Sequence, residues 1–195
     1  PVERFVDGLN AEKRRGRVKL FGVSNWTLER IQEFNTVADS KGLDKIGVIS
    51  NNFSLARMID PVWKGCMASS LPDFKAWLEE TQTLLMPWSS QARGFFTDRS
   101  APHKTDDREL ARCWYSDDNF ERKRRAETLG RALGVSALNV NLAFVLAQKL
   151  PVCPMVGLRT LKETRTLLPG VGIELSDAAL DWLNLESETE PPELG

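Results

Sequence analysis

The sequence LLMPWSSQARG, residues 84–94, contains the pattern that decides the fold: a short apolar run leads directly into a polar turn. We predict a buried strand over Leu84 to Trp88, because a short apolar run bounded by turn residues is typical of one. Ser89 to Gly94 then supplies hydroxyl groups, a cation and a glycine that lets a ligand approach the backbone. Three other stretches of the chain have the same order of strand and polar turn.

Predicted helices separate these stretches. The stretches are Arg17 to Val23 with Ser24-Asn25-Trp26, Ile46 to Ser50 with Asn51-Asn52-Phe53, and Val152 to Val156 with Gly157-Leu158-Arg159. Strands that alternate with helices predict a sheet of four parallel strands with flanking helices. The pattern alone fits either an open doubly wound sheet or part of a (β/α)8 barrel, and the 195 residues are too few for a complete barrel, which typically needs about 250. In both folds ligands bind beyond the carboxyl ends of the strands, where the four turns lie.

Composition limits the classes of function. The formal net charge of −1 gives no support to a nucleic-acid or membrane-surface role. Cys66, Cys113 and Cys153 are odd in number and far apart, which favours reduced thiols in a cytoplasmic protein. His103 is the only histidine, so a transition-metal site is not expected. We predict one domain over residues 1–185 and a disordered tail over 186–195, which is acidic and contains prolines.

The turn after the fourth predicted strand has the parts of a phosphate site. Gly157 allows close approach, Arg159 supplies a guanidinium, and Thr160 begins a helix whose first N–H groups are expected to be free. An ordinary αβ connection with solvent-facing charges has the same pattern. Ser89 and Arg93 give the turn after the third strand a similar character, although a solvated glycine and serine loop also fits.

The remaining turns offer an amide and aromatic rings. Ser24 and Asn25 end the first predicted strand, and an asparagine side chain donates and accepts as a carboxamide ligand requires, although Ser-Asn is also common in simple turns. Phe53 and Trp88 each offer a flat face to an aromatic ring, and each is equally suited to a core position.

Taken together, these turns resemble the aldo-keto reductase family. The likeness extends from the first residues to about Leu185. The segments that carry it are Phe21-Gly22-Val23-Ser24-Asn25-Trp26, Asn52-Phe53-Ser54-Leu55-Ala56, Pro87-Trp88-Ser89-Ser90-Gln91-Ala92-Arg93-Gly94-Phe95-Phe96, Leu133-Gly134-Val135-Ser136, Ala143-Phe144-Val145-Leu146 and Pro154-Met155-Val156-Gly157-Leu158-Arg159-Thr160. An unrelated α/β protein with polar turns is the alternative, and the ordered set of motifs argues against it.

The resemblance implies the C-terminal half of a (β/α)8 barrel that binds NADP(H) in an extended conformation. Ser24 and Asn25 match the pair that holds the nicotinamide carboxamide, and Phe53 matches the aromatic residue that stacks on the nicotinamide. Trp88, Ser89, Gln91 and Arg93 match the loop along the pyrophosphate, while Gly157, Leu158 and Arg159 match the segment at the adenosine end and its 2′-phosphate.

The chain also departs from the family pattern. Ser50 stands where the family usually has a glutamine, Gln91 where leucine is common, and Leu167 and Leu168 where an asparagine near the adenine is frequent. The family's catalytic Asp, Tyr, Lys and His belong to strands upstream of anything that matches this chain. The resemblance therefore assigns no catalytic residue, and no metal site, to these 195 residues.

Two functions follow from this comparison. The first is the cofactor-binding half of an NADPH-dependent reductase of aldehydes or ketones, with the catalytic tetrad absent from this chain and little activity expected from it alone. The second is a non-catalytic truncated relative that binds a dinucleotide or a protein partner. Half a barrel has two open strand edges, so we expect it to associate with a complementary half-barrel or with itself.

Overall fold

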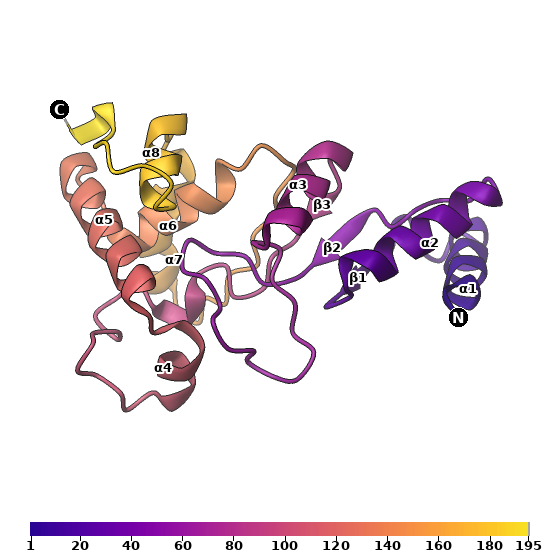
Figure 1. Cartoon of the computed structure of the whole chain (residues 1–195), viewed down its shortest axis with the longest axis horizontal. Coiled ribbons are helices and arrows are strands. Elements are labelled where there is room, and N and C mark those ends of the chain that lie inside the picture. The colour runs from indigo at the N-terminus through magenta and orange to yellow at the C-terminus, as the bar shows by residue number, and fades with distance from the viewer. Residues whose placement is uncertain (195) are drawn as a thin grey trace.

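A parallel sheet joins the two ends of the structure, a computed structural model that describes residues 1–194 (Figure 1). Its strands are β1 (Gly22–Ser24), β2 (Val48–Ser50) and β3 (Leu84–Leu85), in the order β1-β2-β3. Val23 lies opposite Ile49, and Ile49 lies opposite Leu85, so all three carboxyl ends reach the same edge of the sheet.

The sequence predicts four strands, but the structure has three within residues 1–194: the predicted strand from Val152 to Val156 does not form. Val152 forms only an isolated parallel bridge with Leu85, although Cys153 N also donates to Leu85 O at 2.8 Å and Met155 N to Pro87 O at 3.1 Å. In this register the next ladder bonds would be donated by the N–H groups of residues 87 and 151, and both residues are proline, so the ladder does not continue past the bridge. The segment nevertheless runs beside β3, in the place where a fourth strand would lie.

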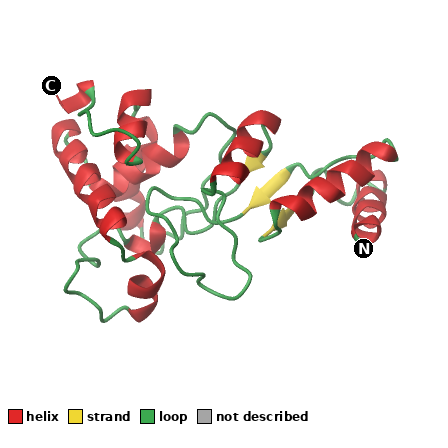
Figure 2. Ribbon diagram, viewed as in Figure 1, coloured by secondary structure: helices red, strands yellow, loops and turns green. Residues whose placement is uncertain are grey.

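Three helices accompany the strands at the N-terminal end (Figure 2). α1 (Val2–Arg14) packs against α2 (Leu28–Ser40), and α3 (Pro72–Thr81) precedes β3. The side chain of Thr27 accepts from Arg30 N at 3.3 Å, which confirms Thr27 as the cap of α2. β1 and β2 are each followed by a connection that crosses to the next parallel strand, as the alternating pattern predicts.

The C-terminal end of the molecule is helical. The elements are η1 (Ala92–Gly94), α4 (Arg108–Trp114), α5 (Asp117–Leu133), α6 (Ala137–Leu146), α7 (Leu161–Leu167), η2 (Leu168–Gly172), α8 (Asp177–Leu183) and η3 (Pro192–Leu194). Gly134 ends α5 with a φ of +70°, a conformation that favours glycine. Ser136 then caps α6 in a reciprocal arrangement with Asn139.

One apolar core runs from the sheet into the helical end. It includes Phe34 of α2, Ile49 of β2, Leu85 of β3 and Phe144 of α6, all buried. Because the same cluster contains residues from both ends, the sheet and the C-terminal helices pack as one unit. Among residues 1–194 no single helix is both long and apolar enough to span a membrane. α5 and α6 reach that length and apolar character only when taken together, and the two helices meet at a bend of 98°.

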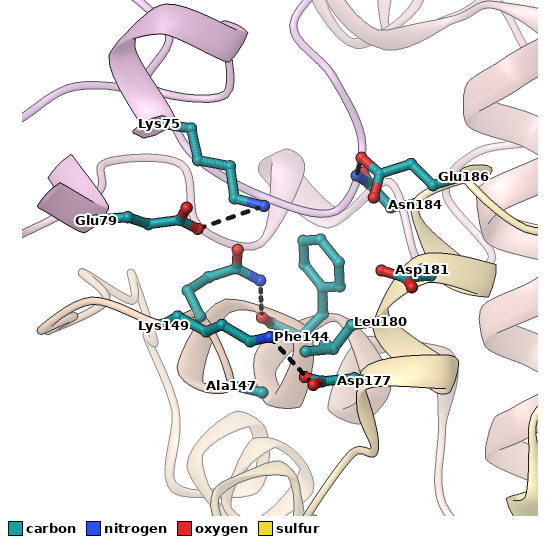
Figure 3. Close-up of a pocket in the computed structure, with 11 residues that line it drawn as sticks. Lys75, Glu79, Phe144, Ala147, Lys149, Asp177, Leu180, Asp181, Asn184 and Glu186 are labelled. Atoms are coloured by element: carbon teal, nitrogen blue, oxygen red, sulfur yellow. Dashed lines mark hydrogen bonds and ion pairs between the residues drawn. The ribbon is translucent and has the colours of Figure 1, made fainter. Parts of the chain in front are cut away.

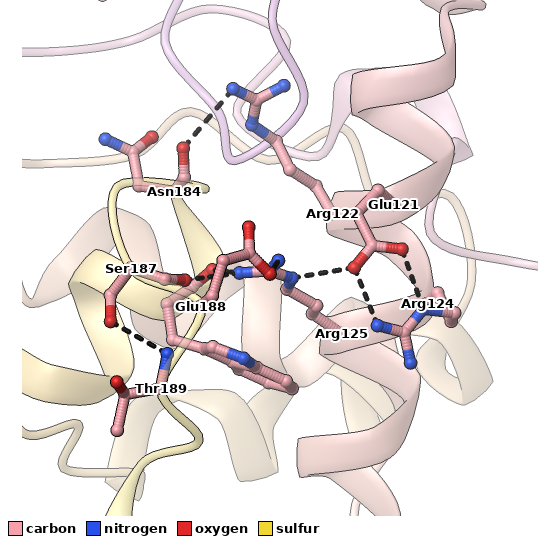
Figure 4. A network of polar contacts seen from close by, with 9 residues as sticks. Glu121, Arg122, Arg124, Arg125, Asn184, Ser187, Glu188 and Thr189 are labelled. Atoms are coloured by element: carbon pink, nitrogen blue, oxygen red, sulfur yellow. Dashed lines mark hydrogen bonds and ion pairs between the residues drawn. The ribbon is translucent and has the colours of Figure 1, made fainter.

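The C-terminal tail has contacts that its composition does not indicate. The sequence predicts disorder from residue 186, whereas the structure places residues 186–194 against α5 and α8. Arg125 of α5 donates to Ser187 O at 2.6 Å and pairs with Glu188 at 2.6 Å (Figure 4). Glu193 accepts from Ser176 N at 2.9 Å. These partners are distant in sequence, so a local composition argument does not include them.

Candidate functional site

The carboxyl ends of β1 and β2 bring four polar residues together. Ser24 Oγ donates to Ser50 O at 2.7 Å, and Asn25 N donates to Asn51 Oδ1 at 2.7 Å. Asn25 has a φ of +57°, a left-handed conformation that asparagine tolerates better than most residues. The turn therefore holds the Asn25 carboxamide at the edge of the sheet, where its Nδ2 also donates to Ser24 Oγ at 3.1 Å.

The next turn reaches across to the end of β3. Asn52 forms a parallel bridge with Trp88, and Asn52 Nδ2 donates to Trp88 O at 3.3 Å. The indole of Trp88 is half-buried, and its ring lies 4.9 Å from the ring of Trp63, with 31° between the planes. We call this edge, formed by residues 24–25, 50–52 and 88–91, the strand-end rim.

Phe53 does not lie on the exposed part of the rim. Its side chain is only 1% exposed, and it stacks on Phe144 with ring centroids 6.2 Å apart and 10° between the planes. Stacking on a nicotinamide would require this ring to leave the apolar core. Trp88, which the sequence assigns to the pyrophosphate loop, instead presents an aromatic ring at the rim.

The turn after β3 has an unusual backbone. Ser89, Ala92 and Arg93 all have positive φ, at 48°, 44° and 53°, and non-glycine residues held in this region are often associated with ligand-binding turns. Asn141 of α6 supports the turn, because its Nδ2 donates to Ser90 O at 2.9 Å and to Gln91 Oε1 at 3.0 Å. Sequence reasoning missed Asn141, and its polar side chain within an otherwise apolar helix face was the available signal.

The side chain of Arg93 forms an ion pair within the chain. Its guanidinium pairs with Glu109 of α4 at 2.5 Å, and both side chains are substantially exposed. An exposed pair of this kind is weak, so an incoming phosphate could replace the carboxylate. The predicted pyrophosphate contact therefore competes with Glu109.

The predicted phosphate site before α7 is partly filled by the chain itself. Glu163 Oε2 accepts from Arg159 N at 2.6 Å and from Thr160 N at 3.1 Å. The sequence predicts free N–H groups here, whereas in the structure these two are already bonded. The hydrogen bond from the Arg159 backbone is the main reason that the pKa of Glu163 is lowered. Gly157, Leu158 and the Arg159 side chain are exposed, and within residues 1–194 the Arg159 guanidinium has no ion pair.

Several buried polar atoms at the rim have no hydrogen-bond partner. They are Asn51 Nδ2, Trp88 Nε1 and Gln91 Nε2. Buried polar groups are normally paired, and a set of unpaired donors at one edge indicates that an acceptor-rich ligand or water belongs there. The rim thus fits a ligand with carbonyl or phosphate oxygens.

The cavities lie elsewhere. One cavity of 220 Å³ lies between α3 and the α6–α8 region, where Lys75 pairs with Glu79 and Lys149 with Asp177 (Figure 3). Another of 600 Å³ lies between α2 and α3, beside Gly47 at the start of β2. Neither is lined by a predicted site residue. We therefore place the candidate site at the strand-end rim.

The described residues contain no cluster of His, Cys, Asp and Glu able to hold a metal ion.

A family model and two solved structures all relate this chain to aldo-keto reductases. The model of the aldo/keto reductase family matches residues 1–183. A thermostable aldo-keto reductase solved with the inhibitor epalrestat superposes with a TM-score of 0.67 at 16% identity, over 96% of this chain and 55% of that one. An aldo/keto reductase from Klebsiella pneumoniae, solved with NADP and acetate, gives 0.66 at 17% identity, over 95% and 54%. The chain thus spans about half the length of these structures. No curated protein matches it.

Proposed function

Because the chain belongs to the aldo-keto reductase family, we propose that it is the NADPH-binding, C-terminal half of a barrel that reduces aldehydes or ketones. The single observation that carries the proposal is the strand-end rim, where Asn25, Asn51 and Trp88 meet and buried donors remain unpaired. When bound, a reduced nicotinamide supplies a hydride to a carbonyl carbon. The residues of this chain would bind and orient that group, and we assign none of them a catalytic role.

The nicotinamide end would lie at the ends of β1 and β3. The Asn25 carboxamide and Ser24 Oγ offer one acceptor and one hydroxyl to a carboxamide. Trp88 fits the stacking role better than Phe53, because its ring lies at the rim and the ring of Phe53 is buried. The unpaired Gln91 Nε2 and the guanidinium of Arg93 would face the pyrophosphate.

The adenosine end would lie at Gly157, Leu158 and Arg159. Arg159 is exposed and without an ion pair in residues 1–194, so its guanidinium is available for a 2′-phosphate. We expect Arg159→Ala to weaken NADPH binding by about tenfold and NADH binding by much less, since a charge-assisted contact to the extra phosphate is lost. Isothermal calorimetry with both dinucleotides measures this.

A matched control is Arg165→Ala, which removes an exposed arginine from α7, the helix that follows Arg159. It should leave both affinities unchanged. Equal losses for NADPH and NADH in Arg159→Ala, or an equal effect of Arg165→Ala, would contradict the assignment of Arg159 to the 2′-phosphate.

A non-catalytic role is the second candidate. It is favoured by hydrogen bonds within the chain that already occupy the groups predicted to bind the dinucleotide. Met67 N donates to Asn25 Oδ1 at 3.1 Å, and the Arg159 and Thr160 N–H groups donate to Glu163. A carbonyl-reductase assay of the chain mixed with the complementary half-barrel of an aldo-keto reductase separates the two functions. Turnover well above that of a heat-inactivated sample would reject the non-catalytic role.

The partner that we propose is a complementary half-barrel or a second copy of this chain. In the described part of the chain, β1 pairs only with β2, and the 152–156 segment pairs only with β3, so both edges are open. Leu20 beside one edge is 55% exposed, and Met155 at the other is 41% exposed. Sedimentation of the isolated chain as a strict monomer with a sharp thermal transition would argue against such association.

A further inference from the structure

A long loop connects β2 to α3 (Figure 1), and part of it contacts the strand-end rim. Residues 61–69, which we call the rim loop, pair with Asn52: Asn52 N donates to Met67 O at 2.8 Å, and Ser69 N donates to Asn52 O at 2.9 Å. Asn52 also forms a parallel bridge with Ala68, in addition to its bridge with Trp88. The rim loop thus extends the sheet at the edge where the candidate ligand would lie.

Two contacts of the rim loop fall on the groups proposed to hold the nicotinamide. Met67 N donates to Asn25 Oδ1 at 3.1 Å. The indole of Trp63, which is itself 50% exposed, lies against Trp88 with ring centroids 4.9 Å apart. Asn25 therefore already accepts a hydrogen bond from an amide, and Trp88 already has an aromatic ring against it.

These are the two kinds of contact that a nicotinamide makes, since it presents an aromatic ring and a carboxamide N–H donor. We propose that the rim loop is a self-bound lid that occupies the nicotinamide position and has to move aside before the dinucleotide binds. The inference rests on the proposed function, because it takes the Asn25 and Trp88 end of the rim as the nicotinamide site. It adds that the unliganded chain holds this site closed.

The rim loop is held at both ends, by Arg112 at its start and by the pairing of residues 67–69 with Asn52 at its end, and its middle has room to turn. Arg112 of α4 donates to Pro61 O at 2.8 Å and to Val62 O at 3.2 Å, which fixes its start. Beyond that anchor, Gly65 has a φ of +87° and open space around it, so the loop has a backbone position able to act as a hinge. Trp63 and Met67 lie on either side of this glycine. The Trp63 ring contacts Trp88, whereas Met67 contacts the rim twice, through its N–H to Asn25 and its carbonyl oxygen from Asn52.

A lid of this kind lowers the apparent affinity by the fraction of molecules in which the site is open. Removing the Trp63 ring should raise that fraction, and the strength of an aromatic pair corresponds to NADPH binding about three- to tenfold more tightly in Trp63→Ala. The matched control is Ile59→Ala, which truncates an exposed apolar residue in the same connection but outside the rim loop. Its affinity should equal that of the wild type when both are titrated with NADPH by calorimetry.

The outcomes separate the lid from the proposed function. Unchanged or weaker binding by Trp63→Ala, with measurable binding by the wild type, overturns the lid and leaves the dinucleotide site standing. Absence of NADPH binding in the wild type, Trp63→Ala and Ile59→Ala overturns the proposed function, and the lid falls with it. Binding by Trp63→Ala alone supports both.

A thiol provides a second measurement that does not depend on affinity. Cys66 lies in the rim loop, is only 8% exposed, and its Sγ accepts from Trp63 N at 3.3 Å. In a Cys153→Ser background, which removes the exposed thiol, saturating NADPH should speed the labelling of Cys66 by a disulfide reagent several-fold. Cys113 is buried in the core and should stay slow. A Cys66 labelling rate that NADPH leaves unchanged would overturn the lid.

Discussion

The strand-end rim and the network around Arg125 are both built from polar side chains, but they use their donors differently (Figure 4). Arg125 is 3% exposed, and all three of its nitrogens are paired, with Glu121, Glu188 and the carbonyl oxygens of Trp182 and Ser187. At the rim, Asn51, Trp88 and Gln91 each keep a buried nitrogen without a partner. A completed network stabilises the fold, whereas an incomplete one at the carboxyl ends of parallel strands is suited to a ligand.

The largest effect that would test this contrast is on stability. Arg125→Ala removes the donors that hold Trp182 O and Ser187 O, at 2.8 and 2.6 Å, together with two ion pairs. We expect it to lower the free energy of unfolding by about 3 kcal/mol, because breaking a buried charge network by removing one member costs about 3–5 kcal/mol and the two carboxylates here remain partly solvated. Urea denaturation followed by circular dichroism measures the loss.

Arg124→Ala is the matched control for this substitution. Arg124 neighbours Arg125 in α5 and pairs with the same Glu121 at 2.6 Å, but it is 61% exposed. Its loss should cost less than about 1 kcal/mol. Similar losses from the two substitutions would show that the buried position of Arg125 carries no special weight.

A smaller effect on stability should depend on pH. The hydrogen bond from Arg124 is the main reason that the pKa of Glu121 is lowered to about 2, and Arg125 contributes further. The folded pKa is below the unfolded value of about 4.3, so this contribution is present above that value and is lost as the pH falls toward about 2. After discounting for solvent screening of a partly exposed group, we expect about 1 kcal/mol.

Urea midpoints measured between pH 5 and pH 2 test this expectation. In Glu121→Gln the fall in stability over that range should be smaller than in the wild type, because the titrating group is absent. Parallel curves for the two proteins would mean that other carboxylates account for the acid sensitivity.

The sequence predicts more of the fold than of the site. Regular alternation of apolar runs and helical patterns predicts parallel strands with flanking helices, because local periodicity and caps such as Thr27 depend on nearby residues. It overestimates the strand lengths. Pro87 and Pro151 explain the loss of the fourth strand, since a residue without an N–H cannot continue a ladder. The contacts of residues 186–194 are not visible in their composition, because their partners Arg125 and Ser176 are remote in sequence.

The site is harder to predict because it depends on contacts between turns. The pattern of turns places Asn25 and Trp88 at the carboxyl ends of the strands, and Asn51 and Asn52 link these two residues in the structure. A motif does not reveal that the ring of Phe53 packs on Phe144, since an aromatic residue after a strand suits core and surface equally. Nor does it show which of the chain's own groups fill a site. The roles of the predicted residues toward a dinucleotide remain predictions.

The smallest effect concerns the adenosine end, where a carboxylate occupies the predicted phosphate position. Glu163→Ala frees the Arg159 and Thr160 N–H groups and removes a negative charge from the start of α7. Anions are stabilised at helix N-termini, so we expect NADPH to bind about threefold more tightly. Glu174→Ala, which removes an exposed carboxylate outside α7, is the control for net charge. If the two substitutions raise the affinity equally, the gain reflects overall charge; if Glu163→Ala weakens binding, the capping box positions Arg159 for the phosphate and does not compete with it.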